Sequence, residues 1–290
     1  MRVLITGAGG QLAADLATTF EQAGHAVSRR ARAELDIADD AAVRATLEDT
    51  APDVILNPAA YNRVDDAEQD PALSFSVNAF GPRALARATA NRDAILVHYS
   101  TDYVVDGAKG MPYTEDDAPL PLSAYASSKL AGEYFARTLA PRHYALRVCG
   151  LFGLAGRATR HGNFVETMLR AAANGRSLRV VADQVVAPTA TRDVAAATLA
   201  LLERAAPHGL YHCTASGETS WYDYARAIFE FAGVAADLGP TTAAEYAAPA
   251  PRPSYSILDN AKLERAVGTR PRHWRDALEE YLSTRQKSSR

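Results

Sequence analysis

The chain has 290 residues, of which 48% are hydrophobic and 22% charged. Its length allows one large domain or two ordinary ones, and its apolar content excludes a disordered or coiled-coil protein. A net charge of −3 excludes the broad basic surface of many nucleic-acid-binding proteins. The two cysteines are too few for a disulfide framework or a structural zinc site, and they fit a reducing compartment.

Neither the N-terminus nor the interior carries an export or membrane signal. The apolar run at residues 3–5 ends at a glycine-rich turn and is shorter than a signal peptide requires. The longest apolar run, residues 194–202, is about half a transmembrane span. We therefore expect a cytoplasmic protein with no membrane or nucleic-acid partner.

The first half of the chain alternates short apolar segments with amphipathic ones. Strands are expected at residues 2–6, 25–29, 54–57, 94–100 and 143–149, and helices at 11–22, 40–48, 71–90 and 124–139. Strands separated by helices predict βαβ units and a parallel sheet covered on both faces. The predicted fold class is therefore α/β, with a doubly wound, Rossmann-type parallel sheet.

The second half is less regular. Helices are expected at residues 164–173, 193–205 and 221–231, strands at 178–181 and 210–213, a loop at 241–253 and a frayed tail at 283–290. We predict a dinucleotide-binding domain at residues 1–150 and a smaller α/β domain, mainly substrate-binding, at 151–290. The helix near residues 191–205 is expected to pack back on the first domain.

The first turn between a strand and a helix, residues 6–13, reads TGAGGQLA. Gly7 and Gly10 let the backbone turn tightly and approach a pyrophosphate, whose charge the N-terminus of the next helix stabilises. The alternative is an ordinary tight turn. Its place as the first such turn of the chain favours a dinucleotide site.

The end of the second strand carries Arg29, Arg30 and Arg32, with no acidic residue for the adenosine ribose. Guanidinium groups there suit the 2′-phosphate of NADPH, although a solvated basic loop is the alternative. Farther on, Asp36 and Ile37 could contact the adenine, or Asp36 could serve only as a turn or cap residue. The predicted cofactor is NADPH, with NADH as a second one that the enzyme could accept.

A third motif pairs Tyr125 with Lys129, four residues apart on one helix face. An ammonium group close to a phenol lowers the phenol pKa, which makes tyrosine a usable proton donor. Thr101 stands at the carboxyl end of an upstream strand, where ligands of such sheets bind, and can donate to a substrate oxygen. Each feature alone is common, as a surface pair or a capping hydroxyl.

Together, these three features resemble the extended short-chain dehydrogenase/reductase family. More specific runs resemble the dTDP-4-dehydrorhamnose reductases within it, at residues 10–12, 59–65, 98–104, 162–164, 183–184, 188–189 and 252–253. These runs follow the family's order over almost the whole chain. The resemblance implies hydride transfer from a reduced nicotinamide to the 4-keto group of a dTDP-sugar, dTDP-4-dehydro-L-rhamnose.

The resemblance also implies roles for individual residues. Thr101, Tyr125 and Lys129 match the catalytic residues, and Lys129 also binds the nicotinamide ribose. The remaining matches are Gly10, Gln11 and Leu12 at the pyrophosphate, Asp36 and Ile37 at the adenine, Ala60, Tyr61 and Asn62 along the cofactor, Tyr99 beside the nicotinamide, and Asp102, Tyr103 and Asn163 toward the sugar.

Two departures from the family pattern affect these expectations. Gly150 stands where the family often has a tryptophan that packs on the substrate, which leaves the exact sugar open. Some relatives dimerise through magnesium held by glutamates; Asp15 could take part, but Arg192 replaces another carboxylate. We therefore predict no metal, and either a monomer or a homodimer.

Three other functions stay open. A dehydratase or epimerase would carry Asp-Glu after Thr101, but this chain has Asp102 and Tyr103. A 4-ketoreductase for antibiotic deoxysugars would share every catalytic residue. A non-catalytic regulatory subunit that binds NADP is the third alternative, which the intact Thr101, Tyr125 and Lys129 disfavour.

Overall fold

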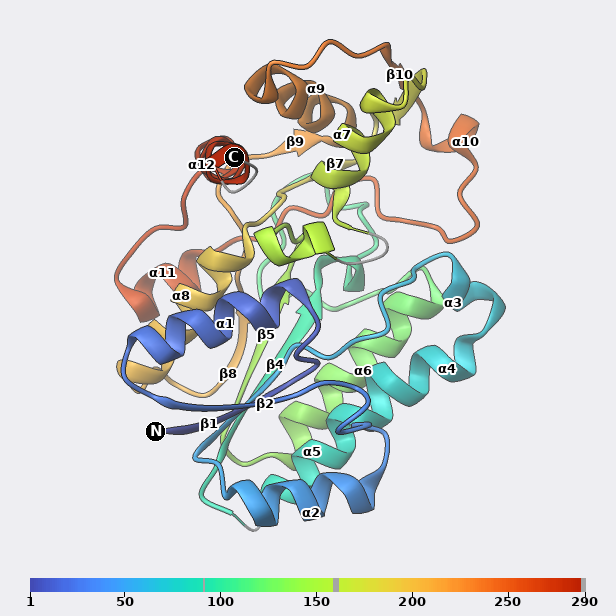
Figure 1. The fold of residues 1–290 in the computed structure, drawn as a ribbon. Helices are drawn as coiled ribbons and strands as arrows, with labels where there is room; N and C mark the ends of the chain where they lie inside the picture. Colours follow the sequence, from blue (N-terminus) through green and yellow to red (C-terminus); the bar gives the residue numbers. More distant parts are fainter. Residues whose placement is uncertain (91, 159–161, 288–290) are drawn as a thin grey trace.

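The computed structural model describes residues 1–90, 92–158 and 162–287. Its centre is a six-stranded sheet in the order β2-β1-β3-β4-β5-β8, with all neighbouring strands parallel (Figure 1). The strands are β1 (Arg2–Thr6), β2 (Ala26–Arg30), β3 (Val54–Asn57), β4 (Ile95–Thr101), β5 (His143–Val148) and β8 (Gly209–His212). The expected doubly wound α/β fold is confirmed. The strand order reverses between β1 and β3, and such a point opens a crevice at the carboxyl ends of the strands.

Helices cover both faces of the sheet because its buried strands are apolar on both sides. On one face lie α1 (Gln11–Gln22), α8 (Thr191–Glu203) and α11 (Ala261–Val267). On the other lie α2 (Asp40–Thr50), α5 (Gly81–Thr89) and α6 (Ala124–Leu139). Adjacent strand residues divide between the two cores: Val3 and Ile5 face α1, whereas Leu4 faces α2.

The expected helix at residues 71–90 is interrupted. It consists of α4 (Pro71–Phe75), a π-helical turn η1 (Ser76–Phe80) and α5. Pro82 explains the break, since proline has no N–H to donate and its ring crowds the preceding turn.

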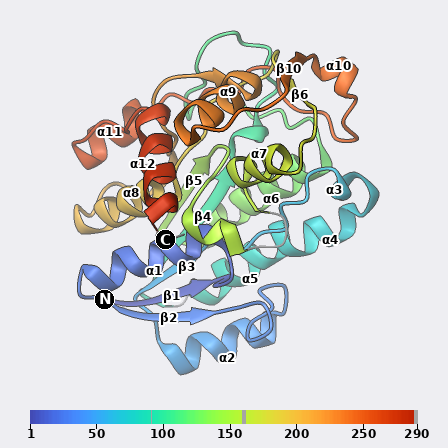
Figure 2. The same cartoon turned by 45° about the horizontal axis from the view of Figure 1, so that its top comes forward.

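Apart from α8, β8 and α11, the second half forms a layer at the carboxyl ends of the strands (Figures 1 and 2). The helices α7 (Phe164–Ala173), α9 (Trp221–Ala232) and α12 (Trp274–Lys287) share a core around Tyr224 and Phe152. Its strands form two pairs: β6 (Leu178–Val181) with β10 (Leu238–Thr241) in parallel, and β7 (Val185–Val186) with β9 (Thr219–Ser220) antiparallel. The remaining short elements are α3 (Asp66–Gln69), η2 (Asp102–Val104), η3 (Leu154–Ala158) and α10 (Ala243–Tyr246).

Several segments differ from the sequence-based expectation. The strand expected at residues 210–213 is β8, which completes the sheet of the first half beside β5. The expected packing of the helix near residues 191–205 is seen in α8, whose Val194 and Leu201 share a core with α1. The expected loop at 241–253 contains α10.

We expected residues 283–290 to form a frayed tail. This prediction is wrong for residues 283–287, because α12 continues to Lys287. Tyr281 and Leu282 are buried, and Arg285 pairs with Glu166 of α7, so this helix is held by the second core. The last part of that expectation, residues 288–290, lies outside the described residues. Within the described ranges, no helix is long and apolar enough to cross a membrane.

Candidate active site

A cleft lies at the carboxyl ends of β1, β2 and β3, where the strand order reverses. Its lining includes the first turn, the loop after β2 and the loop after β3. Eight of the residues predicted to bind the cofactor line it: Gly7, Gly10, Gln11, Asp36, Ile37, Ala60, Tyr61 and Asn62. The other predicted cofactor residues are Leu12, Arg30, Tyr99, Tyr125 and Lys129, and they lie elsewhere.

The first turn has the geometry of an anion site. Gly7 has φ +60°, and an added Cβ would lie 2.8 Å from the Cα of Ala59, so only glycine fits. Gly10 is the N-cap of α1 and provides no side-chain cap, which leaves the helix N-terminus facing the cleft for a phosphate. The side chain of Leu12 is buried in the core, so Leu12 can contribute to such a site only through its backbone N–H.

The two arginines at the end of β2 and the one just after it do not all lie where the sequence analysis placed them. Arg30 does not line the cleft: its guanidinium donates to Ser28 Oγ at 3.1 Å and lies 3.8 Å from Asp49. Arg29 pairs with Glu21. Arg32 is exposed and lines the cleft, so it is the arginine of this loop best placed to meet a phosphate there.

Side chains behind the cleft hold its lining in place. Asn78, which sequence reasoning missed, accepts from the Tyr61 N–H and donates to the Tyr61 carbonyl, both at 2.8 Å. Asp36 accepts from the Ala38 N–H at 3.0 Å, as a turn aspartate does, and it also lines the cleft. Ile37 is buried against Gly81 of α5.

The structure brings two of the three predicted catalytic residues together. Thr101 ends β4, and its hydroxyl lies near the phenol of Tyr125 at the start of α6, close enough to influence the pKa of that phenol. Ser123 caps that helix, with its Oγ accepting from the Ala126 N–H at 3.2 Å. Lys129 lies one turn farther along α6, and its Nζ donates to the Tyr99 carbonyl at 2.5 Å.

Burial shifts the pKa values of Tyr125 and Lys129. It raises the pKa of Tyr125 to about 12, while the nearby Thr101 hydroxyl lowers it and the charge of Asp102 raises it. Burial lowers the pKa of Lys129 to about 8, and nearby Glu133 opposes that change. The expected lowering of the phenol pKa by Lys129 is therefore not seen, because the ammonium group faces the Tyr99 carbonyl. Tyr125 is protonated at neutral pH, as a proton donor must be.

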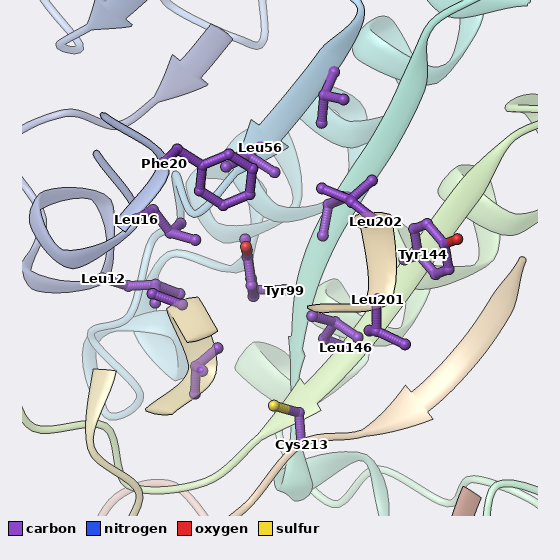
Figure 3. Packing of buried hydrophobic residues seen from close by; sticks show 14 of the residues in the cluster. Leu12, Leu16, Phe20, Leu56, Tyr99, Tyr144, Leu146, Leu201, Leu202 and Cys213 are labelled. Carbon is purple, nitrogen blue, oxygen red and sulfur yellow. The ribbon is translucent and has the colours of Figure 1, made fainter. Parts of the chain in front are cut away.

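The ring of Tyr99 lies in the core beneath α1 and α8. It packs among residues such as Leu12 and Leu146 (Figure 3), and the Tyr99 hydroxyl is 3.1 Å from Thr198 Oγ1. Side chains alternate along a strand, so the ring points away from α6 while the carbonyl meets Lys129. The place of Tyr99 beside the nicotinamide stays a prediction.

Two residues predicted to face the sugar lie behind the site. Asp102 is buried, with Oδ2 accepting from Ser256 at 2.6 Å and Oδ1 from Thr101 at 3.3 Å, and burial raises its pKa to about 6. Asn163 caps α7, and its Nδ2 donates to Gln11 Oε1 at 3.2 Å. In this structure both residues support their neighbours, whereas Tyr103 lines a second cavity.

This second cavity lies between the catalytic residues and the layer of the second half. Tyr103 connects the two, because its ring meets that of Tyr125 edge-on at 6.3 Å. Aromatic rings and two arginines dominate its wall, a combination that suits a nucleobase and its phosphates. The lining includes Tyr103, Phe164, Met168, Arg179, Val180, Val181, Gln184, Trp221, Tyr246 and Arg252.

Trp221 is the cavity residue that sequence reasoning missed most clearly. Its ring centroid lies 4.7 Å from that of Phe164. An added Cβ on Gly150 would lie 3.2 Å from the Trp221 ring, so this ring adjoins the place where the family often has its tryptophan. The segment looked like the start of an amphipathic helix, and only the tertiary fold brings its first residue into the cavity.

No metal centre is evident in the part of the chain that the structure describes, since no group of three or more His, Cys, Asp or Glu gathers there. Asp15 accepts a hydrogen bond from Thr191, and Arg192 pairs with Glu280. The absence of a metal stays a prediction.

Comparison with known proteins agrees with this site. A family model described as the RmlD substrate binding domain matches residues 1–287. The chain belongs to this family. It is 41% identical to a dTDP-4-dehydrorhamnose reductase of Streptomyces griseus, over 96% of this chain and 92% of the relative.

Two further relatives bear on substrate and cofactor. A probable dTDP-4,6-dihydroxy-2-methyloxan-3-one 4-ketoreductase of Streptomyces antibioticus is 41% identical, over 97% of this chain and 94% of the relative. A crystal structure of a dTDP-4-dehydrorhamnose reductase from Bacillus anthracis in complex with NADP matches with a TM-score of 0.92 and 32% identity. That match covers 98% of this chain and 99% of the other.

Proposed function

We propose that this protein reduces the 4-keto group of dTDP-4-dehydro-L-rhamnose to give dTDP-L-rhamnose, with NADPH as hydride donor. The observation that carries the proposal is the pairing of buried Thr101 with half-buried Tyr125 next to an aromatic, arginine-bearing cavity, in a chain of this family that also has a dinucleotide cleft. Relatives named dTDP-4-dehydrorhamnose reductase and one solved with NADP support it.

The residues present fit this cofactor. The N-terminus of α1 would receive the pyrophosphate, Arg32 the 2′-phosphate, Asp36 and Ile37 the adenine, and Lys129 the nicotinamide ribose. Residues 1–150 with α8 and β8 would form the cofactor-binding part, and most of 151–290 the part that holds the dTDP-sugar. When bound, the cofactor supplies the hydride.

The chain's own residues handle the substrate oxygen and its proton. Thr101 donates a hydrogen bond to the 4-keto oxygen, and Tyr125 gives up its phenolic proton as negative charge develops there. Lys129, whose ammonium group is held by the Tyr99 carbonyl, would bind the nicotinamide ribose through its charged form and so orient the cofactor. Tyr103 and Trp221 exclude water from the cavity and hold the dTDP-sugar against the pair.

The deciding experiment measures NADPH oxidation with dTDP-4-dehydro-L-rhamnose and, in parallel, with a dTDP-4-keto-2,6-dideoxy sugar. We expect turnover of both and a higher kcat/KM for the first. A higher value for the dideoxy sugar would instead establish the antibiotic-type 4-ketoreductase, which Gly150 and the Streptomyces antibioticus relative favour. Binding of NADPH without turnover of either sugar would indicate the non-catalytic subunit.

We also predict that the protein is cytoplasmic and that it is either a monomer or a homodimer. Light scattering at assay concentrations would decide the oligomeric state.

A further inference from the structure

The chain from residue 250 to 256, here called the strap, runs from the second cavity to the catalytic residues. Alternate side chains of the strap bond to separate parts of the molecule: Arg252 to Asp65, Ser254 to the Gly107 carbonyl at 3.1 Å, and Ser256 to Asp102 at 2.6 Å. This alternation is that of an extended segment, and residue 255 forms a bridge with Val185 of β7. The strap is thus held along its whole length.

The first of these contacts is the most specific. Arg252 Nη2 lies 2.9 Å and 3.0 Å from the two carboxylate oxygens of Asp65, and the Ala250 N–H also donates to Asp65 at 3.2 Å. Arg252 Nη1 returns to the Ala250 carbonyl at 2.9 Å, which fixes the guanidinium plane. The Arg252 side chain is only 18% exposed, so solvent screens this pair less than an ordinary surface pair.

The two partners belong to different clefts. Asp65 lines the cofactor cleft, on the loop that includes Ala60, Tyr61 and Asn62. Arg252 lines the second cavity together with Tyr103, whose ring packs on Tyr125. Figures 1 and 2 both place α10, which precedes the strap, on the same side of the molecule as α3, which follows Asp65.

We propose that Asp65 and Arg252 are positioning residues that couple the two clefts. A dinucleotide that fixes the loop at residues 60–66 also fixes Asp65, and Asp65 then holds Arg252 and the strap in the conformation that receives the dTDP-sugar. The second ligand no longer bears the entropic cost of ordering the strap, so it binds more tightly. This inference rests on the proposed function, because it takes NADPH and a dTDP-sugar as the two ligands.

The test measures the dissociation constant of dTDP by calorimetry, without NADPH and with saturating NADPH. In the wild type we expect NADPH to tighten dTDP binding about fivefold or more, and linkage requires dTDP to tighten NADPH binding by the same factor. In Asp65→Asn and Arg252→Gln this factor should fall to about one. The double variant should show no further loss, because the two residues act as a pair.

Matched controls separate coupling from simple loss of charge. Asp66→Asn removes a carboxylate from the same loop, whose partner is Arg63, and Arg179→Gln removes a guanidinium from the same cavity, whose partner is Asp237. Each control is expected to change the affinity for one ligand and to keep the coupling factor. A merely structural pair would lower the melting temperature of Asp65→Asn without changing that factor.

Either of two results would overturn the inference: a wild type that binds both ligands independently, or an Asp65→Asn variant that keeps the wild-type coupling factor. If Arg252→Gln fails to fold, Asp65→Asn alone decides the question. Failure of the proposed function looks different, since a wild type that bound neither NADPH nor dTDP would remove the ligands themselves.

Discussion

Tyr125 is half-buried, protonated at neutral pH and close to Thr101, so its phenol is the proton source of the proposed reaction. Tyr125→Phe removes this proton and keeps the ring that packs edge-on against Tyr103. We expect turnover to fall by about 10²–10⁴-fold with NADPH affinity nearly unchanged. Steady-state kinetics and a fluorescence titration of NADPH check both parts, and full activity in this variant would exclude Tyr125 as the acid.

Because its ammonium group is buried, Lys129 is expected to make turnover depend on pH in a definite direction. Burial lowers its pKa to about 8, so the group is charged below that pH and loses its charge as pH rises through it. Because the mechanism uses the charged form, kcat should decline above about pH 8. Lys129→Arg keeps a charge at every accessible pH and should remove this decline, whereas Lys129→Ala should weaken both turnover and NADPH binding. A wild-type decline that persists unchanged in Lys129→Arg would assign the titration to another group.

Arg30, the last residue of β2, and Arg32, in the loop after it, allow a direct comparison. Arg32 lines the cofactor cleft, whereas Arg30 is engaged with Ser28 and faces Asp49. One guanidinium–phosphate hydrogen bond contributes roughly 1.5–3 kcal/mol, so the wild type should prefer NADPH over NADH by about tenfold to a hundredfold. Arg32→Ala should lose most of this preference and Arg30→Ala little of it, as measured by kcat/KM for each cofactor. The opposite order would restore the sequence-based assignment to Arg30.

At the scale of elements, α6 carries two of the proposed catalytic residues and lies unusually close to the π-turn η1. Gly132 of α6 makes this possible, since a Cβ there would collide with the carbonyl oxygen of Asn78. Gly132→Ala should destabilise the fold by about 1–3 kcal/mol and also lower turnover, because α6 must shift. Thr138→Ala, on the exposed face of the same helix, should change stability by less than about 0.5 kcal/mol. Urea unfolding of both variants makes the comparison, and equal stabilities would contradict it.

The elements that sequence reasoning predicted well are those with a strong local pattern. The bounds of α6 and α7 agree with the expectation, because each has a clear apolar periodicity and a capping residue, Ser123 or Asn163, before it. The helix α12 was missed because charged and polar residues dominate its sequence and its apolar face becomes evident only against α7 and α9. The break at η1 was missed although Pro82 was visible in the sequence.

The same distinction applies to the candidate site: some of its residues follow from local sequence motifs, and others do not. The glycine turn, Thr101, Tyr125 and Lys129 were predictable because each chemical role depends on a short local motif. Trp221, Arg252 and Ser256 come from the second half and reach the site only through tertiary packing, which no local pattern encodes. The burial of the Tyr99 ring was not foreseen either, because a motif fixes the position of a residue and not the face of the sheet that its side chain takes.

At the scale of the whole molecule, the two halves share one sheet and one core, since β8 pairs with β5 and α8 packs against α1. We therefore expect one cooperative unfolding transition. The chain's two tryptophans, Trp221 and Trp274, both lie in the second half, so their fluorescence reports on that half alone, whereas far-UV circular dichroism reports on all helices. The two curves should coincide in urea, and separate midpoints would show that the halves unfold independently.

The late origin of β8 has a consequence for synthesis on the ribosome. Five strands of the sheet can emerge and pair before the second half is made. The apolar side of α1 has no α8 to cover it until residues 191–203 follow, and β5 is an open edge until residues 209–212 follow. An unpaired strand edge beside exposed apolar surface invites association with other chains. The nascent protein thus passes through a vulnerable interval that ends only when its second half arrives. A fragment cut at residue 150 would remain in that state permanently.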